Sequence, residues 1–364
     1  MAAPEALAGS MDALVLHAVG DIRFERRPVP ALRPGWARVR VAHCGVCGSD
    51  LPRIYRKGTY RFPTVPGHEM AGTVEAVAED IGDLRAGDRV AVFPLIWCGR
   101  CAACERGAYA QCEAYDYLGS RSDGGFATYV AAPRANLIRV PEGVSLAEAA
   151  MAEPAAVALH ALRRASCRAG ESVAVFGAGP IGLLVAQWAR AMGAAPILLF
   201  DVVDEKLRLA RSLGFEDSLS SRDAEAAARV RDATDGRGAH VCVEAAGVSS
   251  TVLSALASAR PGGRVVLLGN PSGDVTLPAA AISALMRGEV SVLGAWNSVY
   301  SAHGNDDDWS AVLGAVAARN LDLCSLVTHE VPLSRGVTAL EAMRDGRRSS
   351  CKVLLHPDTE EVAR

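Results

Sequence analysis

The sequence predicts an α/β protein with two domains: a mainly antiparallel β domain and a doubly wound parallel sheet flanked by helices. Its 364 residues are enough to build two hydrophobic cores. Short β-like runs separated by turns fill the chain up to about residue 140, and strands alternate with helices from about residue 162. Such alternation is typical of parallel βαβ units in an open sheet.

The antiparallel domain is predicted over residues 11–161 and 302–364, after a flexible extension at residues 1–10. Frequent glycine and proline residues supply the turns between its strands. Its predicted strands cover residues 13–16, 36–42, 72–77, 89–93 and 126–130. Its predicted closing elements are helices at 309–318 and 337–344 and a strand at 352–355.

The parallel sheet is predicted over residues 162–301, because strand, glycine turn and helix follow one another there. Its predicted strands are 172–176, 197–200, 240–244, 264–268 and 290–293. Its first two predicted helices are 181–192 and 205–213.

The composition excludes several classes of function. The net charge is −3 and no run of Lys or Arg occurs, so we expect neither a nucleic-acid partner nor a membrane partner. The longest apolar stretches, such as 181–189, are shorter than the roughly 20 residues of a membrane span. Ten cysteines without a secretory signal favour a reducing compartment, and we expect a cytoplasmic protein.

Four cysteines gather in one short stretch, which we expect to form a lobe over about residues 95–115. Cys98, Cys101 and Cys104 recur at every third residue, and Cys112 follows after a short loop. Four thiolates at such spacing enclose one zinc ion in the tetrahedral arrangement of a closed, structural site. A disulfide framework is the alternative, but a chain of this length in a reducing compartment does not need one. Since a closed site performs no chemistry, the reaction must take place elsewhere.

A glycine turn at the start of the parallel sheet predicts a Rossmann dinucleotide site. Gly177, Gly179 and Gly182 form GxGxxG directly after a buried strand, and a helix begins near Pro180 and Ile181. The glycines permit the tight turn, the approach of the pyrophosphate and close packing of helix on strand, and the helix N-terminus faces the phosphates. A purely structural tight turn is the alternative interpretation.

The strand after this turn ends at Asp201, at the distance expected of the acid that binds the adenosine ribose. A carboxylate there accepts hydrogen bonds from the ribose hydroxyls and repels a 2′-phosphate. Val202 and Val203 follow it, and no arginine does. The sequence therefore favours NAD over NADP.

Cysteine, histidine and glutamate residues of the first domain form a second candidate metal set. Cys47 lies in a turn after a strand, His68 and Glu69 precede the next strand, and Glu153 stands ahead of the βαβ section. These are ligand types of a catalytic zinc, which keeps one position open for water or substrate. Asp50 is placed to hold the imidazole of His68. Taken singly, each has a structural alternative: a small buried residue, a core histidine or a carboxylate at a helix start.

The order and separation of these motifs resemble those of the zinc-containing medium-chain dehydrogenase/reductase superfamily, the alcohol and sorbitol dehydrogenase group. The motifs are Cys47-Gly-Ser-Asp50, Gly67-His-Glu69, the four-cysteine lobe, Glu153-Pro and the glycine turn. The resemblance covers essentially the whole chain after residue 10. It implies a GroES-like first domain, two zinc ions per chain, NAD as cofactor, and a homodimer or homotetramer.

By the same resemblance, Cys47 and not Cys44 corresponds to the catalytic-zinc cysteine, because Ser49 and Asp50 follow Cys47 at the family's spacing. His68 corresponds to the second ligand. The third ligand varies within the family, and both glutamates of the set are candidates, directly or through water.

The resemblance also implies roles for residues around the metal. Hydride would pass from a carbinol carbon to nicotinamide while zinc lowers the pKa of the alcohol, and the Ser49 hydroxyl would carry the alcohol's proton to the cofactor ribose. Alcohol dehydrogenases finish this relay with a histidine that is missing here, which leaves water near Glu153 or solvent. Lys206 matches a basic residue that lies beside the adenosine in relatives.

Within the superfamily the chain most resembles the galactitol-1-phosphate 5-dehydrogenases, in segments 49–55, 115–126 and 290–297. The implied substrate is a secondary alcohol of a polyol or cyclitol, phosphorylated or not, with Arg53 and Tyr55 in the pocket. Arg53 has two interpretations: a guanidinium that grips a substrate phosphate, or one that is exposed or paired with a local carboxylate.

Other functions use the same parts. A dehydrogenase of a primary alcohol, an aldehyde or an amino alcohol is one alternative, and a cyclitol-phosphate ketoreductase of a biosynthetic pathway is another. A non-enzymatic NAD-binding protein is a third, and the intact candidate ligands argue against it.

Overall fold

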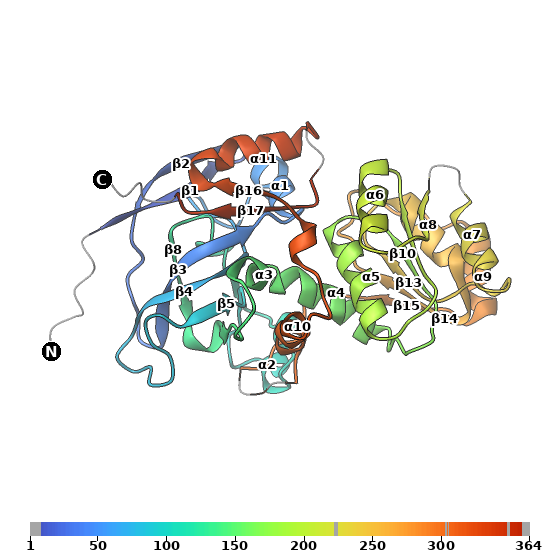
Figure 1. The fold of residues 1–364 in the computed structure, drawn as a ribbon, viewed down its shortest axis with the longest axis horizontal. Coiled ribbons are helices and arrows are strands. Elements are labelled where there is room, and N and C mark those ends of the chain that lie inside the picture. Colours follow the sequence, from blue (N-terminus) through green and yellow to red (C-terminus); the bar gives the residue numbers. More distant parts are fainter. Residues whose placement is uncertain (1–8, 222–224, 303, 305, 348–349, 359–364) are drawn as a thin grey trace. The chain divides into compact units, whose positions relative to one another are not determined.

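The computed structural model describes residues 9–221, 225–302, 304, 306–347 and 350–358 (Figure 1). The chain divides into two compact units. Unit 1 comprises Met1–Glu153, Val299–Arg319 and Leu323–Arg364, and unit 2 comprises Pro154–Ser298 and Asn320–Asp322. The first division therefore falls inside helix α4 (Ala152–Arg164), before the predicted boundary at 161/162. Residues 1–8 of the predicted extension lie outside the described residues.

Unit 1 is built around a seven-stranded sheet in the order β16-β17-β3-β4-β5-β9, with β8 paired to β3. β16 and β17 are parallel, and the other pairs are antiparallel. The strands are β3 (Trp36–Gly45), β4 (Glu69–Val77), β5 (Arg89–Val92), β8 (Tyr129–Pro133), β9 (Leu137–Arg139), β16 (Val327–Pro332) and β17 (Lys352–His356). A separate antiparallel pair joins β1 (Ser10–Ala18) to β2 (Asp21–Pro28).

Short helices connect these strands, and one hydrophobic core holds the unit together. Its fully buried members include Leu14, Leu16, Ile54 and Phe126. Helix α11 lies beside β16 and β17 (Figure 1). The helices and helical turns are α1 (Asp50–Pro52), η1 (Arg53–Lys57), η3 (Arg134–Asn136), α3 (Leu146–Ala150), α10 (Asp308–Ala317), η4 (Cys324–Leu326), η5 (Leu333–Arg335) and α11 (Gly336–Arg344).

The predicted lobe of unit 1 carries its own small elements. They are β6 (Leu95–Ile96), α2 (Ala102–Glu105), η2 (Tyr109–Gln111) and β7 (Asp116–Tyr117). β6 and β7 pair in antiparallel fashion. The rings of Trp97 and Tyr109 stack with their centroids 4.1 Å apart, which packs η2 against the strand that enters the lobe.

Unit 2 is a six-stranded parallel sheet in the order β12-β11-β10-β13-β14-β15. The strands are β10 (Val173–Phe176), β11 (Ile197–Asp201), β12 (Ser218–Ser220), β13 (Ala239–Glu244), β14 (Ala259–Leu267) and β15 (Ser291–Gly294). The helices are α5 (Pro180–Ala191), α6 (Asp204–Ser212), α7 (Ala226–Asp232), α8 (Ser249–Ser258) and α9 (Ala279–Gly288). Helices α5 and α6 cover one face and α7, α8 and α9 the other (Figure 1).

This strand order is that of the Rossmann fold. In it, successive strands are added on one side of the first strand and then on its other side. Ligands bind such sheets at the carboxyl ends of the strands on either side of that point, here β10 and β13. The predicted fold class is therefore confirmed. No helix among the described residues is both long and apolar enough to cross a membrane.

Candidate metal centres and dinucleotide site

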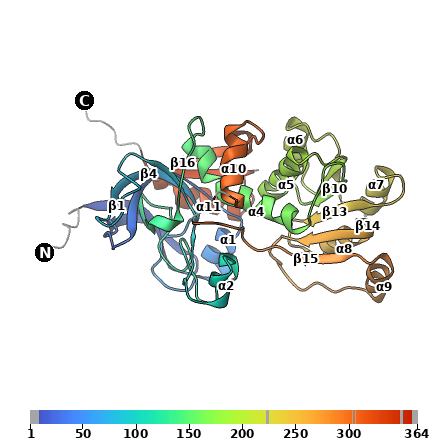
Figure 2. The ribbon, with the colours of Figure 1, turned by 90° about the horizontal axis from the view of Figure 1, so that it is seen from below.

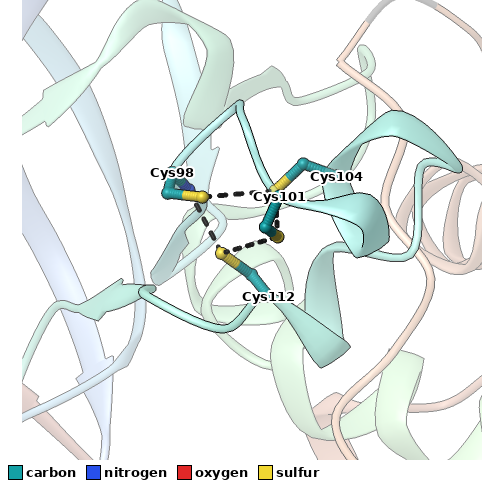
Figure 3. Close-up of side chains that lie close together, drawn as sticks. All are labelled: Cys98, Cys101, Cys104 and Cys112. Carbon is teal, nitrogen blue, oxygen red and sulfur yellow. Dashed lines mark hydrogen bonds between the residues drawn. The ribbon is translucent and has the colours of Figure 1, made fainter.

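The four cysteines of the lobe converge on one point (Figure 3). The Cys101 sulfur lies 3.5 Å from that of Cys104 and 4.0 Å from that of Cys112, and the sulfurs of Cys98 and Cys104 are 3.9 Å apart. Zinc–sulfur bonds of about 2.3 Å place tetrahedral sulfurs about 3.8 Å apart. The four sulfurs therefore fit a closed zinc site, and all ten cysteines of the chain are free of disulfides.

Backbone N–H groups of the lobe favour ionised sulfur at Cys98 and Cys101, whereas burial raises the pKa of the Cys104 thiol to about 12. The backbone N–H groups of Glu113 and Cys104 point at Cys101 and lower the pKa of its thiol to about 6. The backbone N–H of Cys98 lies 3.2 Å from the Cys112 sulfur. Thiolates packed this closely repel one another unless a cation lies between them.

We expect Cys101→Ser and Cys104→Ser each to remove one zinc ion per chain and to lower the unfolding temperature, because metal bound to the folded site contributes to folding free energy. Metal analysis and thermal unfolding of the purified variants measure both effects. Cys324→Ser changes an exposed cysteine outside the lobe and serves as the control. Unchanged zinc content in the two lobe variants would contradict the assignment.

The second candidate set comes together in unit 1 because β3 and β4 are paired. Gly45 at the end of β3 lies opposite Glu69 at the start of β4, so Cys47 and His68 flank the same point of the sheet. One ligand atom each of Cys47, His68 and Glu69 lies within 4.8 Å of the other two. A Cβ atom at Gly45 would lie 2.1 Å from Glu69 Oε2, so only glycine leaves room for this carboxylate. The three donor types suit a catalytic zinc with an open position.

Asp50 contacts two of the three candidate ligands, Cys47 and His68. It is fully buried, and its Oδ2 accepts a hydrogen bond of 3.0 Å from the Cys47 backbone N–H. Its Oδ1 lies 3.4 Å from His68 Nδ1, close enough for an electrostatic contact but not aligned as a hydrogen bond. Burial alone would raise the pKa of Asp50, but His68 and Arg53 outweigh it and hold the pKa below its usual range. Asp50 is therefore a buried carboxylate in electrostatic contact with His68.

Arg53 donates to the same carboxylate. Its Nη1 lies 2.8 Å from Asp50 Oδ1, and its side chain is 20% exposed. The structure thus shows the second of the two interpretations, a local ion pair. Tyr55 lies on the same turn, packs against the core of unit 1 and carries the Arg344 guanidinium 4.7 Å from its ring.

Lys352 is a site residue that the sequence analysis missed. Its ammonium lies 2.6 Å from Glu69 Oε2, and both side chains are almost completely buried. It also donates to the Val46 carbonyl at 3.3 Å. Although burial lowers the pKa of a lysine, the charges of Glu69 and Cys47 raise that of Lys352 to about 12. Lys352 is one of only three lysines among 38 basic residues, and that rarity could have drawn attention to it.

Glu153 and Tyr117 close the group. The Tyr117 hydroxyl donates to Glu153 Oε1 at 3.3 Å, and its ring lies edge-on to His68 at 5.8 Å. Burial raises the pKa of Glu153 to about 7, and the charge of Glu69 acts in the same direction. Burial also raises the pKa of Tyr117, so its hydroxyl remains a donor. Tyr117 is a second residue to which the sequence analysis gave no role.

Ser49 lies at the edge of the group. Its hydroxyl lies 3.3 Å from the Cys47 sulfur, and its backbone N–H lies 3.5 Å from the same atom. The hydroxyl is therefore held beside the first candidate ligand.

The glycine turn of unit 2 has the geometry of a dinucleotide site. Gly177 has a φ of 108°, which favours glycine, and a Cβ at Gly182 would lie 1.7 Å from the Gly177 carbonyl oxygen. Gly179 caps α5, has no neighbouring atom where a Cβ would point, and is followed by Pro180 and Ile181 in the first turn. The first and third glycines make the turn and the close packing possible, and the second leaves space for a pyrophosphate.

Asp201 ends β11 with its side chain fixed. Its Oδ2 accepts from the Ala178 N–H at 2.8 Å, its Oδ1 accepts from the Val203 N–H at 2.9 Å, and Lys206 Nζ lies 3.3 Å from Oδ2. Glu244 ends β13, and hydrogen bonds fix its carboxylate in the same way. The sequence analysis gave it no role. It is 1% exposed and accepts from the N–H groups of residues 246 and 247 and from a hydroxyl at 251.

A sulfur-rich structural site, an open Cys–His–Glu site and a Rossmann turn together define a zinc-dependent dehydrogenase that uses a nicotinamide dinucleotide. Comparison with known families agrees. Residues 33–142 match the alcohol dehydrogenase GroES-like domain, and residues 180–318 match the zinc-binding dehydrogenase domain. The chain belongs to the zinc-binding dehydrogenase family, and it is an enzyme of the alcohol dehydrogenase type.

Individual relatives cover almost the whole chain. Galactitol 1-phosphate 5-dehydrogenase of Escherichia coli K12 is 35% identical, over 95% of this chain and 100% of its own length. Sorbitol dehydrogenase of Bacillus subtilis is 31% identical, over 96% of this chain and 98% of its own length. The crystal structure of galactitol-1-phosphate dehydrogenase from Escherichia coli superposes with a TM-score of 0.89 at 34% identity, over 95% of this chain and 100% of that one.

Proposed function

We propose that this enzyme oxidises a secondary alcohol of a polyol, free or phosphorylated, with NAD, and reduces the corresponding ketone in the reverse direction. The observation that carries the proposal is the Cys47–His68–Glu69 group, whose ligand atoms lie within 4.8 Å of one another in a buried site with an acid–hydroxyl pair beside it. The relatives named above act on sugar alcohols or their phosphates, which supports the substrate class.

In this proposal Cys47, His68 and Glu69 would hold the catalytic zinc, which would act as a Lewis acid and lower the pKa of the substrate alcohol. Glu69 suits the third place because its Oε2 is occupied by Lys352 and its Oε1 is left for the metal. Glu153 is not one of the three residues whose ligand atoms lie within 4.8 Å of one another. We assign it to hydrogen-bonding a water or the substrate hydroxyl.

The chain's own groups then orient the substrate and move its proton. Tyr117 holds Glu153 through the hydrogen bond at 3.3 Å, so the carboxyl faces the group in a fixed orientation. The Ser49 hydroxyl, 3.3 Å from the Cys47 sulfur, would accept the proton of the substrate alcohol and release its own proton to water or solvent. The glycine turn, Asp201 and Lys206 would hold the adenosine part of NAD, which would supply the hydride acceptor when bound.

A substrate panel tests the proposal. Purified enzyme with NAD is given galactitol 1-phosphate, galactitol, sorbitol, a cyclitol phosphate, a primary alcohol and an amino alcohol, and NADH formation is followed. We expect turnover of the polyol class and negligible turnover of the last two. Turnover confined to primary or amino alcohols would contradict it.

Asp201 should set the cofactor preference. Its carboxylate would face the 2′-phosphate of NADP as a like charge, which costs about one to two decades in kcat/KM. We expect Asp201→Ala to reduce the difference in kcat/KM between NAD and NADP, through a higher KM for NAD and a lower KM for NADP. Asp204→Ala, at the exposed start of α6, is the control. Equal use of both cofactors by the wild-type enzyme would contradict this role.

We also propose a homodimer that joins two copies at the open edge of the unit 2 sheet (Figure 2). Among the described residues β15 has a sheet partner on one side only, and Val292 on it is 45% exposed. Helix α9 buries none of its residues, and Met286 on it is 74% exposed. An edge strand paired with its own copy satisfies its free N–H and C=O groups. Light scattering that finds a 38.0 kDa particle would contradict this.

The ten free cysteines support a cytoplasmic location in this proposal, because the zinc ligands must stay reduced. Fractionation of expressing cells tests this location. Detection of the protein outside the cytoplasmic fraction would contradict it.

A further inference from the structure

Arg121 of unit 1 has surroundings unlike those of the arginines beside it. Its guanidinium carbon lies 4.0 Å from the ring centroid of Tyr60 and 4.5 Å from that of Tyr115. Two aromatic faces thus hold the cation in a fixed plane. Its backbone N–H donates to the Tyr117 carbonyl at 2.8 Å, which fixes the turn that carries it.

This guanidinium lacks a carboxylate partner among the described residues, whereas its neighbours have one. Arg53 is paired with Asp50 at 2.8 Å, and Arg61 is paired with Asp123 at 3.0 Å. The Arg121 Nε is buried and makes no hydrogen bond within the described part of the chain. A partly buried cation and an unsatisfied donor both cost free energy, so the arrangement is stabilised when an anion binds.

The next residue repeats the pattern. The Ser122 hydroxyl is also buried and makes no hydrogen bond to any described residue. Two consecutive side chains of one turn therefore offer unused hydrogen-bond donors. A guanidinium and a hydroxyl are the groups that proteins commonly use for phosphate oxygens.

The turn lies against the candidate catalytic group. A Cβ at Gly124 would lie 2.0 Å from the carbonyl oxygen of Gly67, the residue before His68. The Tyr115 ring that stacks on Arg121 lies edge-on to Tyr117 at 6.3 Å, and Tyr117 contacts His68. The cation is therefore held near the metal group, with aromatic rings between them.

We propose that Arg121, clamped between Tyr60 and Tyr115 and assisted by Ser122, binds the phosphate of a phosphorylated polyol whose secondary alcohol reacts at the Cys47–His68–Glu69 group. This rests on the proposed function and adds the substrate's anionic end to it. Arg121 replaces Arg53 as the specificity-determining cation, because the charge of Arg53 is already neutralised by Asp50.

The test compares the zinc-loaded wild-type enzyme with Arg121→Met and Arg121→Lys. Arg33→Met is the matched control, since it removes an exposed arginine stacked 4.1 Å from the Trp36 ring elsewhere in unit 1. Two readouts are taken: kcat/KM for galactitol 1-phosphate and for galactitol, and calorimetric binding of inorganic phosphate.

In Arg121→Met we expect kcat/KM for the phosphate ester to fall about 10- to 100-fold, as for the loss of a charge-assisted hydrogen bond. The value for galactitol should change less than about twofold. Inorganic phosphate binding should be lost with Arg121→Met, partly retained with Arg121→Lys and unchanged with Arg33→Met.

Equal losses on both substrates would overturn the assignment and leave Arg121 a structural residue, as would phosphate binding that survives Arg121→Met. If the wild-type enzyme oxidises neither polyol while phosphate binding still depends on Arg121, the proposed function fails and the anion site stands. If it oxidises polyols without preference for the phosphate ester, the proposed function stands and the anion site fails.

Discussion

Cys47→Ser and His68→Ala are expected to abolish alcohol oxidation while each variant keeps its fold and one zinc ion per chain. The metal's charge is worth several kcal/mol of transition-state stabilisation, so kcat should fall by at least about 10³- to 10⁴-fold. Both side chains lie at the 4.8 Å group and away from the four-cysteine lobe, so the second zinc should stay bound. Metal analysis and steady-state kinetics on the same preparations measure the two effects.

Cys44→Ala provides the matched control for these variants. Cys44 is fully buried on β3, three residues before Cys47, and is not one of the three candidate ligands. We expect this variant to keep both zinc ions and to retain turnover at some cost in stability. If Cys44→Ala loses the zinc and Cys47→Ser keeps it, the choice between the two cysteines is wrong.

Lys352→Met is expected to lower the free energy of unfolding by about 3–5 kcal/mol, the usual cost of leaving one partner of a buried ion pair uncompensated. Its ammonium is 2.6 Å from Glu69 Oε2, and both side chains are nearly inaccessible to solvent. Chemical denaturation of the wild-type and variant proteins measures the difference. Kinetics should show a loss as well, because the carboxylate loses the partner that holds it.

Two further variants make this result interpretable. Lys57→Met removes an exposed lysine and should change the stability little. In a Glu69→Gln background, Lys352→Met should cost less than in the wild type, because no buried charge is left behind. Equal costs in the two backgrounds would show that the pair does not interact as described.

The motifs of the site could be predicted from sequence because each depends on short local spacing. The three cysteines at every third residue, GxGxxG before a helix and the acid at the end of the next strand are local patterns. This short spacing brings the donors together, and three pairs of lobe sulfurs indeed lie 3.5–4.0 Å apart. Five strands of unit 2 and helices α5 and α6 were predicted for the same reason, but β12 and helices α7, α8 and α9 were not.

Contacts that depend on strand pairing were not predictable in this way. Lys352 meets Glu69 only because β17 lies beside β3, which pairs with β4. Tyr117 and Glu153 are 36 residues apart in the sequence, and the local sequence around neither residue predicts their hydrogen bond. Arg53 has the local signal of a pocket residue, but the carboxylate three positions earlier takes up its charge.

Some elements escaped prediction because their patterns are weak. β2 alternates charged and apolar residues and is largely exposed, which is the pattern of an edge strand with little to bury. The strand predicted at 126–130 is displaced to β8, because Phe126 itself is buried in the core before the strand begins.

The most direct test of the central claim measures NADH formation from a polyol or polyol phosphate. The measurement is made on the zinc-loaded enzyme, after a chelator has removed the zinc assigned to Cys47, His68 and Glu69, and again after zinc is restored. We expect activity to disappear as one zinc per chain is lost, while the lobe keeps its own, and to return with zinc. Turnover that continues after this loss, or a two-zinc enzyme that oxidises no polyol, would contradict the account.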